Sequence, residues 1–498
     1  MPRLSDLSPV ITNADSKKLD ILATQIHHIP DSVLMEQAAS RIYAQLCRDY
    51  DLGNERIALL VGTGNNGGDA LALVRYFPKN VDYDIYLAES ERYSLLNQMQ
   101  QDTLTSLGIT FRSLASFCEN ASAYTLVIDA LYGIGYRAGR TADPQLCLIA
   151  QTLCENESAV AAIDIPSGLA ECNNADNGAR CCICADRTYS IGFLKALFYD
   201  IAARPCCGTI VNLPISFSID DIDDDLKQRR TYLVSRDTAA QNHRPISQFV
   251  HKYTKGAVCV IGGSRGRIGA AIHCGRAALS GGAGIVSALT NDDCLDSLNI
   301  AAPELVCDTI DNIESYLTKY QSFVIGPGVS LTLDKAAQLC RYFGRMEHAV
   351  LDASFFTHYK PDVLPQFAAP PILTPHVGEC LSFFGLDKAQ LCHNTIETVR
   401  WLAAEHGVYL LLKSATQYLG TPDGIVYVID RPNAAAAQAG SGDLLAGLIA
   451  SQLCHAENIA EAVMSAVGMF YDGIEEVTRH SEQSYDIEVF LRTLMSTF

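Results

Sequence analysis

Residues 439–447 read Ala-Gly-Ser-Gly-Asp-Leu-Leu-Ala-Gly, and this stretch decides how the second half of the chain folds. The apolar run that continues to Leu453 predicts a buried helix that begins near Gly442. Glycine lets a ligand approach the bare backbone, and the first turn of a helix offers unpaired N–H groups with partial positive charge. Such a turn suits a phosphate group or a developing oxyanion.

A carboxylate stands beside this predicted anion site. Asp443 is poorly suited to binding an anion, but it is well placed to take a proton from a hydroxyl that attacks a phosphoryl group. The segment therefore predicts a nucleotide-handling site for phosphoryl transfer to a hydroxyl. The alternative is an aspartate that only caps the helix.

Composition limits the class of protein. A chain of 498 residues predicts two or three domains, and 48% apolar residues with 35 glycines fit a soluble α/β protein. The formal charge of −19 argues against general binding to nucleic acid or anionic membranes, because no basic stripe offsets it. No apolar run approaches the roughly 20 residues of a membrane span, and residues 1–25 lack the apolar region of a secretory signal. We expect a cytoplasmic homo-oligomer with no nucleic-acid or membrane partner.

The cysteine content is high, at 18 residues. Without a secretory signal we expect reduced thiols. Cysteines gather at residues 181, 182 and 184 and again at 206 and 207, which raises the possibility of a zinc site. Paired C-x₂-C motifs are absent and adjacent cysteines are awkward ligands, so the pattern favours small buried side chains over a metal site.

Strand-like apolar runs alternate with helical patterns in the first half of the chain. This alternation predicts a doubly wound parallel sheet, in which ligands bind at the carboxyl ends of the strands. Asp129 and Asp164 both stand at such ends. The expected strands cover residues 57–61, 84–87, 126–129 and 161–164.

An acidic run at residues 220–225 is typical of a solvated connector, and a second strand–loop–helix series follows it. We therefore expect two α/β domains, 1–222 and 223–498, the second with a ligand cleft of its own. Gly, Asp, His or Lys follows each strand expected in the second domain, and these strands cover residues 258–261, 323–325, 349–351, 372–374 and 409–412.

The turn at residues 62–69 reads Gly-Thr-Gly-Asn-Asn-Gly-Gly-Asp and contains the G-x-G-x-x-G spacing of a dinucleotide-binding turn. A turn that only cradles pyrophosphate needs neither asparagine side chains nor a carboxylate at the helix start. Together with Asp129 and Ser167, these oxygen atoms would suit a hard cation or a polar ligand. The asparagines could also be simple turn formers.

Three motifs in the first half resemble the NAD(P)H-hydrate epimerase family: the turn at 62–69, Val-Ile-Asp-Ala-Leu-Tyr-Gly-Ile-Gly at 127–135, and Ile-Asp-Ile-Pro-Ser-Gly-Leu at 163–169. The match continues through 185–188 to Lys195. The resemblance implies a Rossmann-like domain that interconverts the R and S hydrates of NADH and NADPH, with Asp164 as catalytic proton carrier. It implies a K⁺ ion near Asn66, Asp129 and Ser167. The implied substrate-binding residues are Asn65, Asn66, Gly67, Gly68, Asp69, Gly133, Ile134, Gly135, Tyr136, Arg137, Ala138, Gly139 and Asp164.

An ordered set of motifs in the second half resembles the ADP- or ATP-dependent NAD(P)H-hydrate dehydratases, whose domain is ribokinase-like. The set comprises 251–256, 261–264, 269–270, 281–284, 326–328, 373–376, 412–413 and 439–443. The resemblance implies Asp443 as the catalytic base, and ADP with Mg²⁺ on its phosphates. The implied hydrate-binding residues are Ala270, Gly328, His376 and Asp443, and the implied nucleotide-binding residues are Lys413, Ser414, Ala415, Thr416, Gln417 and Gly442.

The fused arrangement is similar to the bacterial bifunctional NAD(P)H-hydrate repair family, with the hydrates NADHX and NADPHX and ADP as ligands. It implies epimerisation of the hydrates followed by ADP-dependent dehydration of the S form. The same Gly-x-Gly-Asp pattern would also serve a ribokinase-like kinase of small alcohols fused to a nucleotide-binding domain. A nucleotide-binding scaffold without catalysis is a third hypothesis. A dehydrogenase is disfavoured because it leaves the second cleft unexplained.

Overall fold

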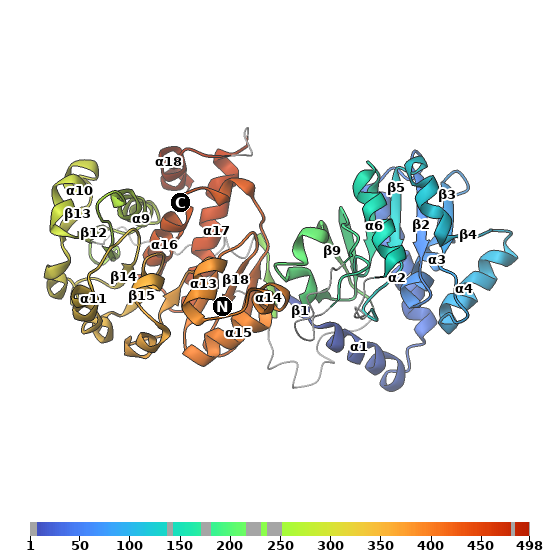
Figure 1. Ribbon diagram of the computed structural model, residues 1–498, viewed down its shortest axis with the longest axis horizontal. Coiled ribbons are helices and arrows are strands. Elements are labelled where there is room, and N and C mark those ends of the chain that lie inside the picture. Colours follow the sequence, from blue (N-terminus) through green and yellow to red (C-terminus); the bar gives the residue numbers. More distant parts are fainter. Residues whose placement is uncertain are drawn as a thin grey trace. The chain divides into compact units, whose positions relative to one another are not determined.

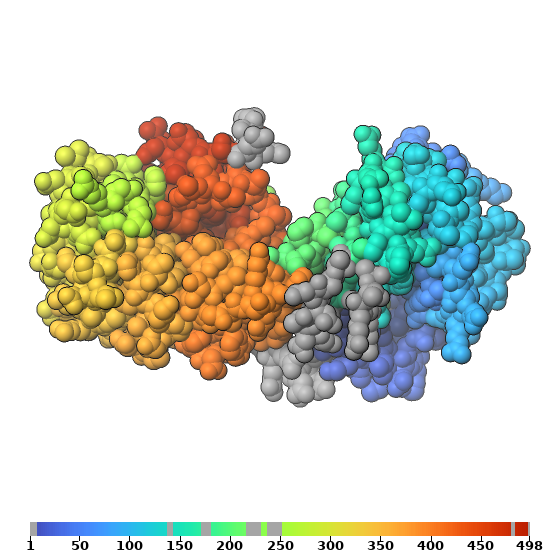
Figure 2. All heavy atoms as spheres, in the orientation of Figure 1, coloured from blue at the N-terminus to red at the C-terminus, as the bar shows by residue number. Residues whose placement is uncertain are grey.

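The computed structural model describes residues 7–136, 143–170, 181–215, 231–236, 251–479 and 484–497. The chain divides into two compact units. The first comprises Pro9–Arg229 with Cys392–Thr395, and the second comprises Met1–Ser8, Arg230–Leu391 and Ile396–Phe498. The first unit is blue to green and the second mainly yellow to red in Figure 1 and, drawn as spheres, in Figure 2.

The first unit is built on a seven-stranded sheet of order β4-β3-β2-β5-β6-β7-β9, in which the paired strands are parallel. Its strands are β2 (Arg56–Val61), β3 (Asp82–Leu87), β4 (Arg112–Ser113), β5 (Leu126–Ala130), β6 (Ala159–Ile163), β7 (Arg187–Ile191) and β9 (Thr209–Leu213). A short parallel pair joins β1 (Leu7–Ile11) to β8 (Leu194–Lys195). The order reverses between β2 and β5, which is where ligands bind in such sheets. The predicted doubly wound sheet is confirmed.

Helices cover both faces of this sheet because its inner strands, such as β2, are apolar on both sides. Ile57, Leu59 and Val61 of β2 pack into one hydrophobic cluster, and Ala58 and Leu60 pack into another. This alternation follows from the two-residue period of a strand. The helices of the unit are α1 (Asn13–Ile21), α2 (Asp31–Asp49), α3 (Asn65–Val74), α4 (Leu95–Ser106), α5 (Phe117–Asn120) and α6 (Pro144–Glu155).

The second unit contains a sheet of order β13-β12-β11-β14-β15-β16-β17-β18-β19-β10. Neighbouring strands are parallel except around β18, which runs antiparallel to β17 and β19. The strands are β10 (Thr231–Val234), β11 (Ala257–Ile261), β12 (Ile285–Thr290), β13 (Val306–Thr309), β14 (Ser322–Ile325), β15 (His348–Leu351), β16 (Ile372–Leu373), β17 (Tyr409–Leu412), β18 (Gln417–Gly420) and β19 (Val426–Ile429). Each strand expected from the sequence of this half is present.

The helices of the second unit include the predicted buried helix. That helix is α16 (Ser441–Leu453), and its side chains from Leu444 to Ile449 are buried among α9 and α17. The prediction over 444–453 is therefore confirmed. The helices are α9 (Ile268–Ser280), α10 (Leu295–Ala301), α11 (Leu333–Cys340), α12 (Phe355–His358), α13 (Val377–Phe384), α14 (Lys388–His393), α15 (Thr395–His406), α16, α17 (Ile459–Val477) and α18 (Ile487–Thr497). Among the described residues, no helix combines the length and the apolar character of a membrane span.

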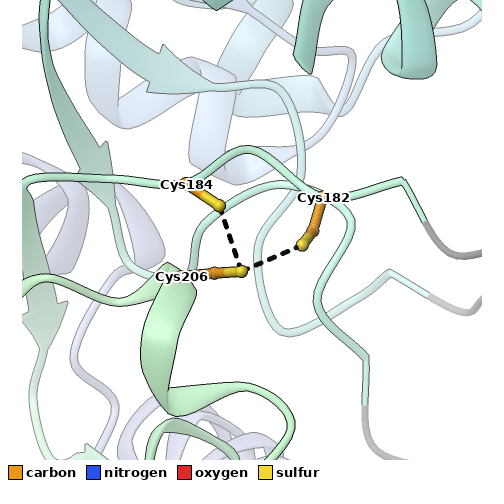
Figure 3. A group of neighbouring side chains, drawn as sticks. All are labelled: Cys182, Cys184 and Cys206. Atoms are coloured by element: carbon orange, nitrogen blue, oxygen red, sulfur yellow. Dashed lines mark hydrogen bonds between the residues drawn. The ribbon is translucent and has the colours of Figure 1, made fainter. Parts of the chain in front are cut away.

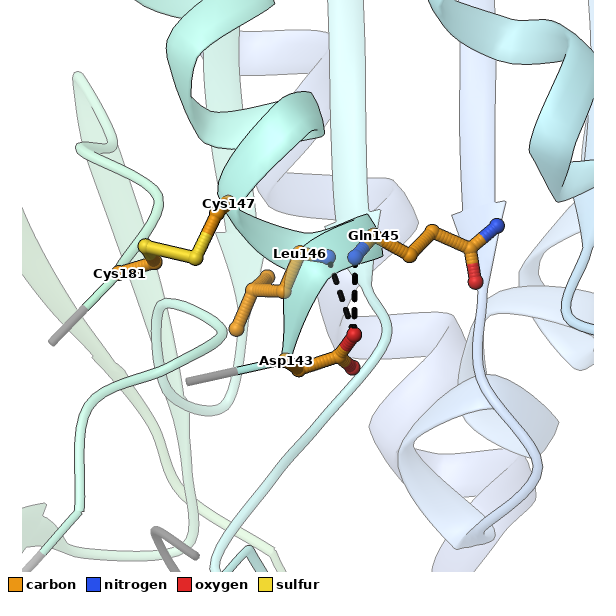
Figure 4. Close-up of a disulfide and its surroundings, with 5 residues drawn as sticks. All are labelled: Asp143, Gln145, Leu146, Cys147 and Cys181. Atoms are coloured by element: carbon orange, nitrogen blue, oxygen red, sulfur yellow. Dashed lines mark hydrogen bonds between the residues drawn. A yellow bond between two sulfur atoms is a disulfide. The ribbon is translucent and has the colours of Figure 1, made fainter. Parts of the chain in front are cut away.

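The cysteines depart from the expectation of reduced thiols. Cys147 of α6 and Cys181 form a disulfide, drawn in Figure 4. The two residues are 34 positions apart, so only the fold that brings α6 beside residue 181 reveals the pair. The expectation of small buried side chains also fails for Cys184, which is exposed, while Cys207 is buried as expected.

Candidate active sites

A pocket of about 690 Å³ lies at the carboxyl edge of the first sheet. It is bordered by the turn after β2, the segment after β5, the residue after β6 and helix α1. Tyr136 stacks on Tyr132 with ring centroids 4.7 Å apart and supplies an aromatic wall. The predicted residues that line the pocket are Asn65, Asn66, Asp69, Gly133, Ile134, Gly135, Tyr136 and Asp164.

Two of the predicted glycines are not among the residues that line the pocket. Gly67 and Gly68 are buried in the first turns of α3, where added side chains would meet the backbone of Gly62 and the side chain of Met35. Helix α3 can therefore approach β2 and α2 closely, and its first turn faces the pocket through Asn65. Three further predicted residues, Arg137, Ala138 and Gly139, lie outside the described residues.

Asp164 is held by an ion pair in the pocket. Its carboxylate accepts a hydrogen bond from Lys195 Nζ at 2.6 Å and another from the Ile134 backbone N–H at 3.3 Å. Asp164 has φ +67°, a left-handed conformation that aspartate and asparagine adopt more readily than most residues. Lys195 is buried and also donates to Ser190 Oγ and to the Ile191 carbonyl. The carboxylate of Asp164 is thus fixed in direction.

Two more carboxyl groups face the same pocket. Burial and the nearby carboxylate of Asp164 raise the pKa of Asp69 well above its usual range, and the carboxylate of Asp20 adds to this effect. Burial, with the charge of Asp164 adding to it and that of Lys195 opposing it, raises the pKa of Asp20 to about 6. Sequence reasoning missed Asp20 because it lies in α1, far from any strand end.

Asn66, Asp129 and Ser167 meet around the backbone of Tyr132. Ser167 donates through its Oγ to Asp129 at 2.6 Å and through its N–H at 2.7 Å, and its Oγ accepts from Tyr132 N–H at 2.9 Å. Asn66 Nδ2 donates to the carbonyls of Tyr132 and Ile163. Burial raises the pKa of Asp129 to about 6, although hydrogen bonds from Ser167 oppose this shift.

The Oδ1 atom of Asn66 is the unusual member of this group. It is buried, and among the described residues it has no hydrogen-bond partner. Buried polar atoms are normally paired, so this unpaired amide oxygen is available to a ligand. An oxygen-liganded cation fits this donor set.

The second candidate site is built around the start of α16. Gly440, at φ +93°, turns the chain into the helix, and Asp443 lies in the first turn. Burial, reinforced by the carboxylate of Asp352 and opposed by Lys413, raises the pKa of Asp443 to about 7. The first turn therefore combines the backbone N–H groups of a helix start with a carboxyl group that can exchange a proton near neutral pH.

Lys413 connects the end of β17 to this turn. Its Nζ donates to Asp352 Oδ1 at 2.6 Å, and a Cβ added to Gly442 would lie 3.2 Å from the same Nζ. Asp352 follows β15 and also accepts from Thr374 Oγ1 at 2.8 Å. The predicted residues Lys413, Gly442 and Asp443 thus lie together, and the carboxylate of Asp352 holds the lysine in place.

His376 caps the first turn of α13. Its ring Nδ1 accepts a hydrogen bond from the backbone N–H of Glu379 at 3.2 Å, and the backbone N–H of His376 donates to Glu379 Oε2 at 2.9 Å. The backbones of His376 and Lys413 also form a parallel β-bridge just beyond the ends of β16 and β17. This contact puts His376 beside the second site. Its side chain is 60% exposed and so available to a ligand.

Glu379 is the third carboxyl group at the second site, after Asp443 and Asp352. Burial raises its pKa. Sequence reasoning missed this residue because glutamate in the first turn of a helix is an ordinary feature.

Ala270 and Gly328 meet at the start of α9. A Cβ on Gly328, where φ is +64°, would lie 3.0 Å from the Cβ of Ala270 and 2.4 Å from the Arg267 carbonyl. One turn further along α9, the ring of His273 lies 3.5 Å from the Cβ position of Gly440. The predicted hydrate-binding residues Ala270 and Gly328 are thus adjacent. Through His273, α9 also contacts the turn at Gly440 that precedes Asp443.

The hairpin between β17 and β18 carries the remaining predicted nucleotide-binding residues, Ser414, Ala415, Thr416 and Gln417. Gln417 Nε2 donates to the Ser414 carbonyl and to Tyr471 Oη, both at 2.8 Å. Thr416 Oγ1 donates to Asp430 at 2.6 Å. Gln417 Oε1 is buried and has no hydrogen-bond partner among the described residues, so the hairpin has an acceptor available for a ligand.

Two family models match the chain. One, described as NAD(P)H-hydrate dehydratase, matches residues 258–474, and the other, described as YjeF-related protein N-terminus, matches residues 31–197. The two matches fall on the two units described above.

Relatives match along most of the chain. The protein named bifunctional NAD(P)H-hydrate repair enzyme Nnr from Gloeobacter violaceus is 32% identical over 458 residues, covering 88% of this chain and 88% of that protein. The protein of the same name from Moorella thermoacetica is 29% identical and covers 93% of this chain and 91% of its own length. A crystal structure of ADP/ATP-dependent NAD(P)H-hydrate dehydratase from Bacillus subtilis, co-crystallised with ATP/Mg²⁺, is 25% identical, with a TM-score of 0.47 and coverage of 52% of this chain and 95% of that chain. The chain belongs to the family of bifunctional NAD(P)H-hydrate repair enzymes.

Proposed function

We propose that this chain returns hydrated NADH and NADPH to their active forms in two reactions. Residues 1–222 would interconvert the R and S hydrates, and residues 223–498 would dehydrate the S hydrate with consumption of ADP. The observation that carries the proposal is Asp443, which lies in the first turn of α16 with a pKa raised to about 7 and close to Lys413. A small-alcohol kinase is disfavoured because relatives that match both halves are named as repair enzymes.

Dehydration needs a better leaving group than hydroxide. Asp443 takes the proton from the hydroxyl at C6 of the hydrated ring as that oxygen attacks the terminal phosphorus of ADP. The new O–P bond forms, the bond to AMP breaks, and the hydrate becomes a phosphate ester. The nitrogen lone pair then expels phosphate, and loss of the C5 proton restores the C5–C6 double bond. The N–H groups near Gly440–Gly442 stabilise charge on the transferred group.

Nucleotide binding rests on groups from three segments. Lys413 is the cation beside the helix start, and Gly442 leaves room for a phosphate or ribose beside the lysine. Gln417 Oε1, buried and without a partner among the described residues, supplies an acceptor in the hairpin. Asp352 is the carboxylate that would hold Mg²⁺ together with phosphate oxygens, since Mg²⁺ is commonly bound by one or two carboxylates. The ion would neutralise charge on the phosphates.

Epimerisation rests on the acid–base groups of the first pocket. Asp164, directed by Lys195 and Ile134 N–H, is the proton carrier at the hydrated ring, and Asn65–Asp69 and Gly133–Gly139 bind the nucleotide. The pKa of Asp69, raised well above its usual range, supplies a carboxyl group that stays protonated in the same pocket, and Asp20, with a pKa raised to about 6, is a second carboxyl group that can exchange a proton there. Asn66, Asp129 and Ser167 would hold K⁺, for which the unpaired Asn66 Oδ1 is the supporting observation. The ion would fix the loops that border the pocket.

The test is incubation of the protein with mixed R and S hydrates, ADP and Mg²⁺. The absorbance of reduced nicotinamide is expected to recover fully, with AMP and phosphate as the other products. Recovery that stops when the S hydrate is consumed would show that the first pocket is inactive, and a stable phosphorylated product would favour a kinase. A cytoplasmic location and a homo-oligomeric state stay predictions.

A further inference from the structure

Three free cysteines converge on one point of the first unit, away from the residues that line its pocket. Cys206 Sγ lies 3.3 Å from Cys182 Sγ and 3.2 Å from Cys184 Sγ. Figure 3 draws the three side chains, which come from two separate segments. The three sulfur atoms all lie within 4.8 Å of one another. Cys184 is exposed, and Cys182 and Cys206 are partly exposed, so the group can be reached from solvent.

Two of these thiols flank a buried side chain. Cys182 is partly exposed and Cys184 is exposed, and Ile183 lies between them in the sequence. Ile183 is fully buried, and its N–H donates to the Ser167 carbonyl at 2.9 Å. Cys181, one residue earlier, is bound to Cys147 instead. Adjacent cysteines are therefore no obstacle, because only alternate ones join the cluster.

The third thiol is brought in by a backbone contact. Cys206 ends a short 3₁₀ turn, Arg204–Cys206, and its carbonyl accepts from Ala185 N–H at 2.9 Å. Next to it, the Cys207 carbonyl accepts from Thr188 Oγ1 at 2.7 Å. The two thiol-bearing segments are thus joined beside the cluster by their own hydrogen bonds, which preorganises the three sulfur atoms.

We propose that Cys182, Cys184 and Cys206 bind a zinc ion through three thiolates, with a fourth position open to solvent. Each thiol releases its proton as its Zn–S bond forms. Thiolates at about 2.3 Å from zinc lie roughly 3.8 Å apart in a tetrahedral site, so Cys206 Sγ needs to move away from the other two sulfur atoms by only about half an ångström. Cys206 is equally close to both other thiols, which suits a shared ion better than a disulfide that leaves one thiol over.

The position of the cluster suggests what the ion does. Ile183, between two of the ligands, is bonded to Ser167, and Ser167 is bonded to Asp129 beside the first pocket. Zinc would therefore fix the segment that supports this serine. Its role is structural, because none of the three cysteines is among the residues that line the pocket.

The test uses the full-length protein, purified with a thiol-free reductant. It is expected to retain about one zinc per chain after gel filtration. Replacement by Co²⁺ is expected to give a sulfur-to-cobalt charge-transfer band and the visible bands of a tetrahedral site. Cys184→Ser, at an exposed position, and Cys206→Ser should each lose the zinc and the cobalt bands. Cys47→Ser, at an exposed free thiol outside the cluster, is the matched control and should keep both.

Three results would overturn the proposal. The reduced parent protein could retain no zinc and give no cobalt bands. Cys184→Ser could bind both metals as the parent does. Peptide mass spectrometry could find two of the three thiols joined as a disulfide in protein purified without any reductant, which would make the group a redox pair.

Discussion

At the scale of single residues, Asp443 carries the most specific part of the account. The sequence placed it at a helix start, and the structure adds what no pattern could supply: the carboxylates of Asp352 and Glu379 and the amine of Lys413 around it. Those neighbours come from the ends of three other elements. Their approach depends on tertiary packing, so Glu379 could not be recognised in advance, whereas Lys413 and Asp443 stood in motifs.

Replacing Asp443 by asparagine should stop dehydration while leaving the fold intact. Asparagine keeps the size of the side chain but cannot take the proton, so the rate of NADH recovery from the S hydrate is expected to fall by about 10²–10⁴-fold. Asp334→Asn is the matched control, because Asp334 also lies in the first turn of a helix but is exposed. An Asp443→Asn variant with the parent rate would contradict the mechanism.

The pH dependence of dehydration should report the same carboxyl group. A general base works when deprotonated, so kcat/KM is expected to be low below the pKa of Asp443, to rise through about pH 7 and to level off above it. Glu379→Gln removes a neighbouring negative charge that raises this pKa, and glutamine can still cap α13. Its profile should therefore shift to lower pH. A profile that is flat across neutral pH, or a shift to higher pH, would show that Asp443 is not the titrating base.

Asp164 allows the corresponding test in the first pocket. Asparagine tolerates the left-handed backbone at this position but cannot carry a proton, so Asp164→Asn is expected to slow R-hydrate consumption by about 10²–10⁴-fold. Turnover of pure S hydrate by the same variant is the internal control and should be unchanged. Equal losses with both hydrates would instead indicate general damage to the protein.

At the scale of elements, the sequence predicted most of the architecture. The apolar runs at residues 57–61 and 409–412 became β2 and β17 because buried parallel strands are apolar on both faces. The disulfide between Cys147 and Cys181 and the placement of α1 against the pocket could not be predicted, since both depend on elements distant in sequence coming together. Asp20 was missed because it lies in α1, whose position beside the pocket the sequence does not reveal.

Helix α16 is the element whose packing the second site depends on most. Leu448 is fully buried within it, so Leu448→Ala is expected to lower the free energy of unfolding by about 2–5 kcal/mol through lost contacts and a cavity. Leu333→Ala removes the same atoms from a side chain that is 88% exposed. This control should change the free energy of unfolding by about 0.5 kcal/mol or less. Urea unfolding of both variants makes the comparison, and equal effects would mean that α16 is not part of the cooperative core.

At the scale of the whole molecule, the chain carries two separate acid–base sites on two separate sheets. The first is built around the Asp164–Lys195 pair, and the second around Asp443 and the Lys413–Asp352 pair. Because the hydrates are small molecules that can diffuse between chains, each site should work without the other being active in the same chain. Loss of one site should therefore be remedied by a second protein that retains it.

The most direct measurement is recovery of reduced nicotinamide from mixed hydrates with ADP and Mg²⁺, using Asp164→Asn and Asp443→Asn separately and then together. Alone, Asp164→Asn should slow sharply once the S hydrate is consumed, and Asp443→Asn should recover almost nothing. Mixed, the two variants should reach the full recovery of the parent protein. If the mixture does no better than Asp164→Asn alone, the assignment of the two reactions to these two sites is wrong.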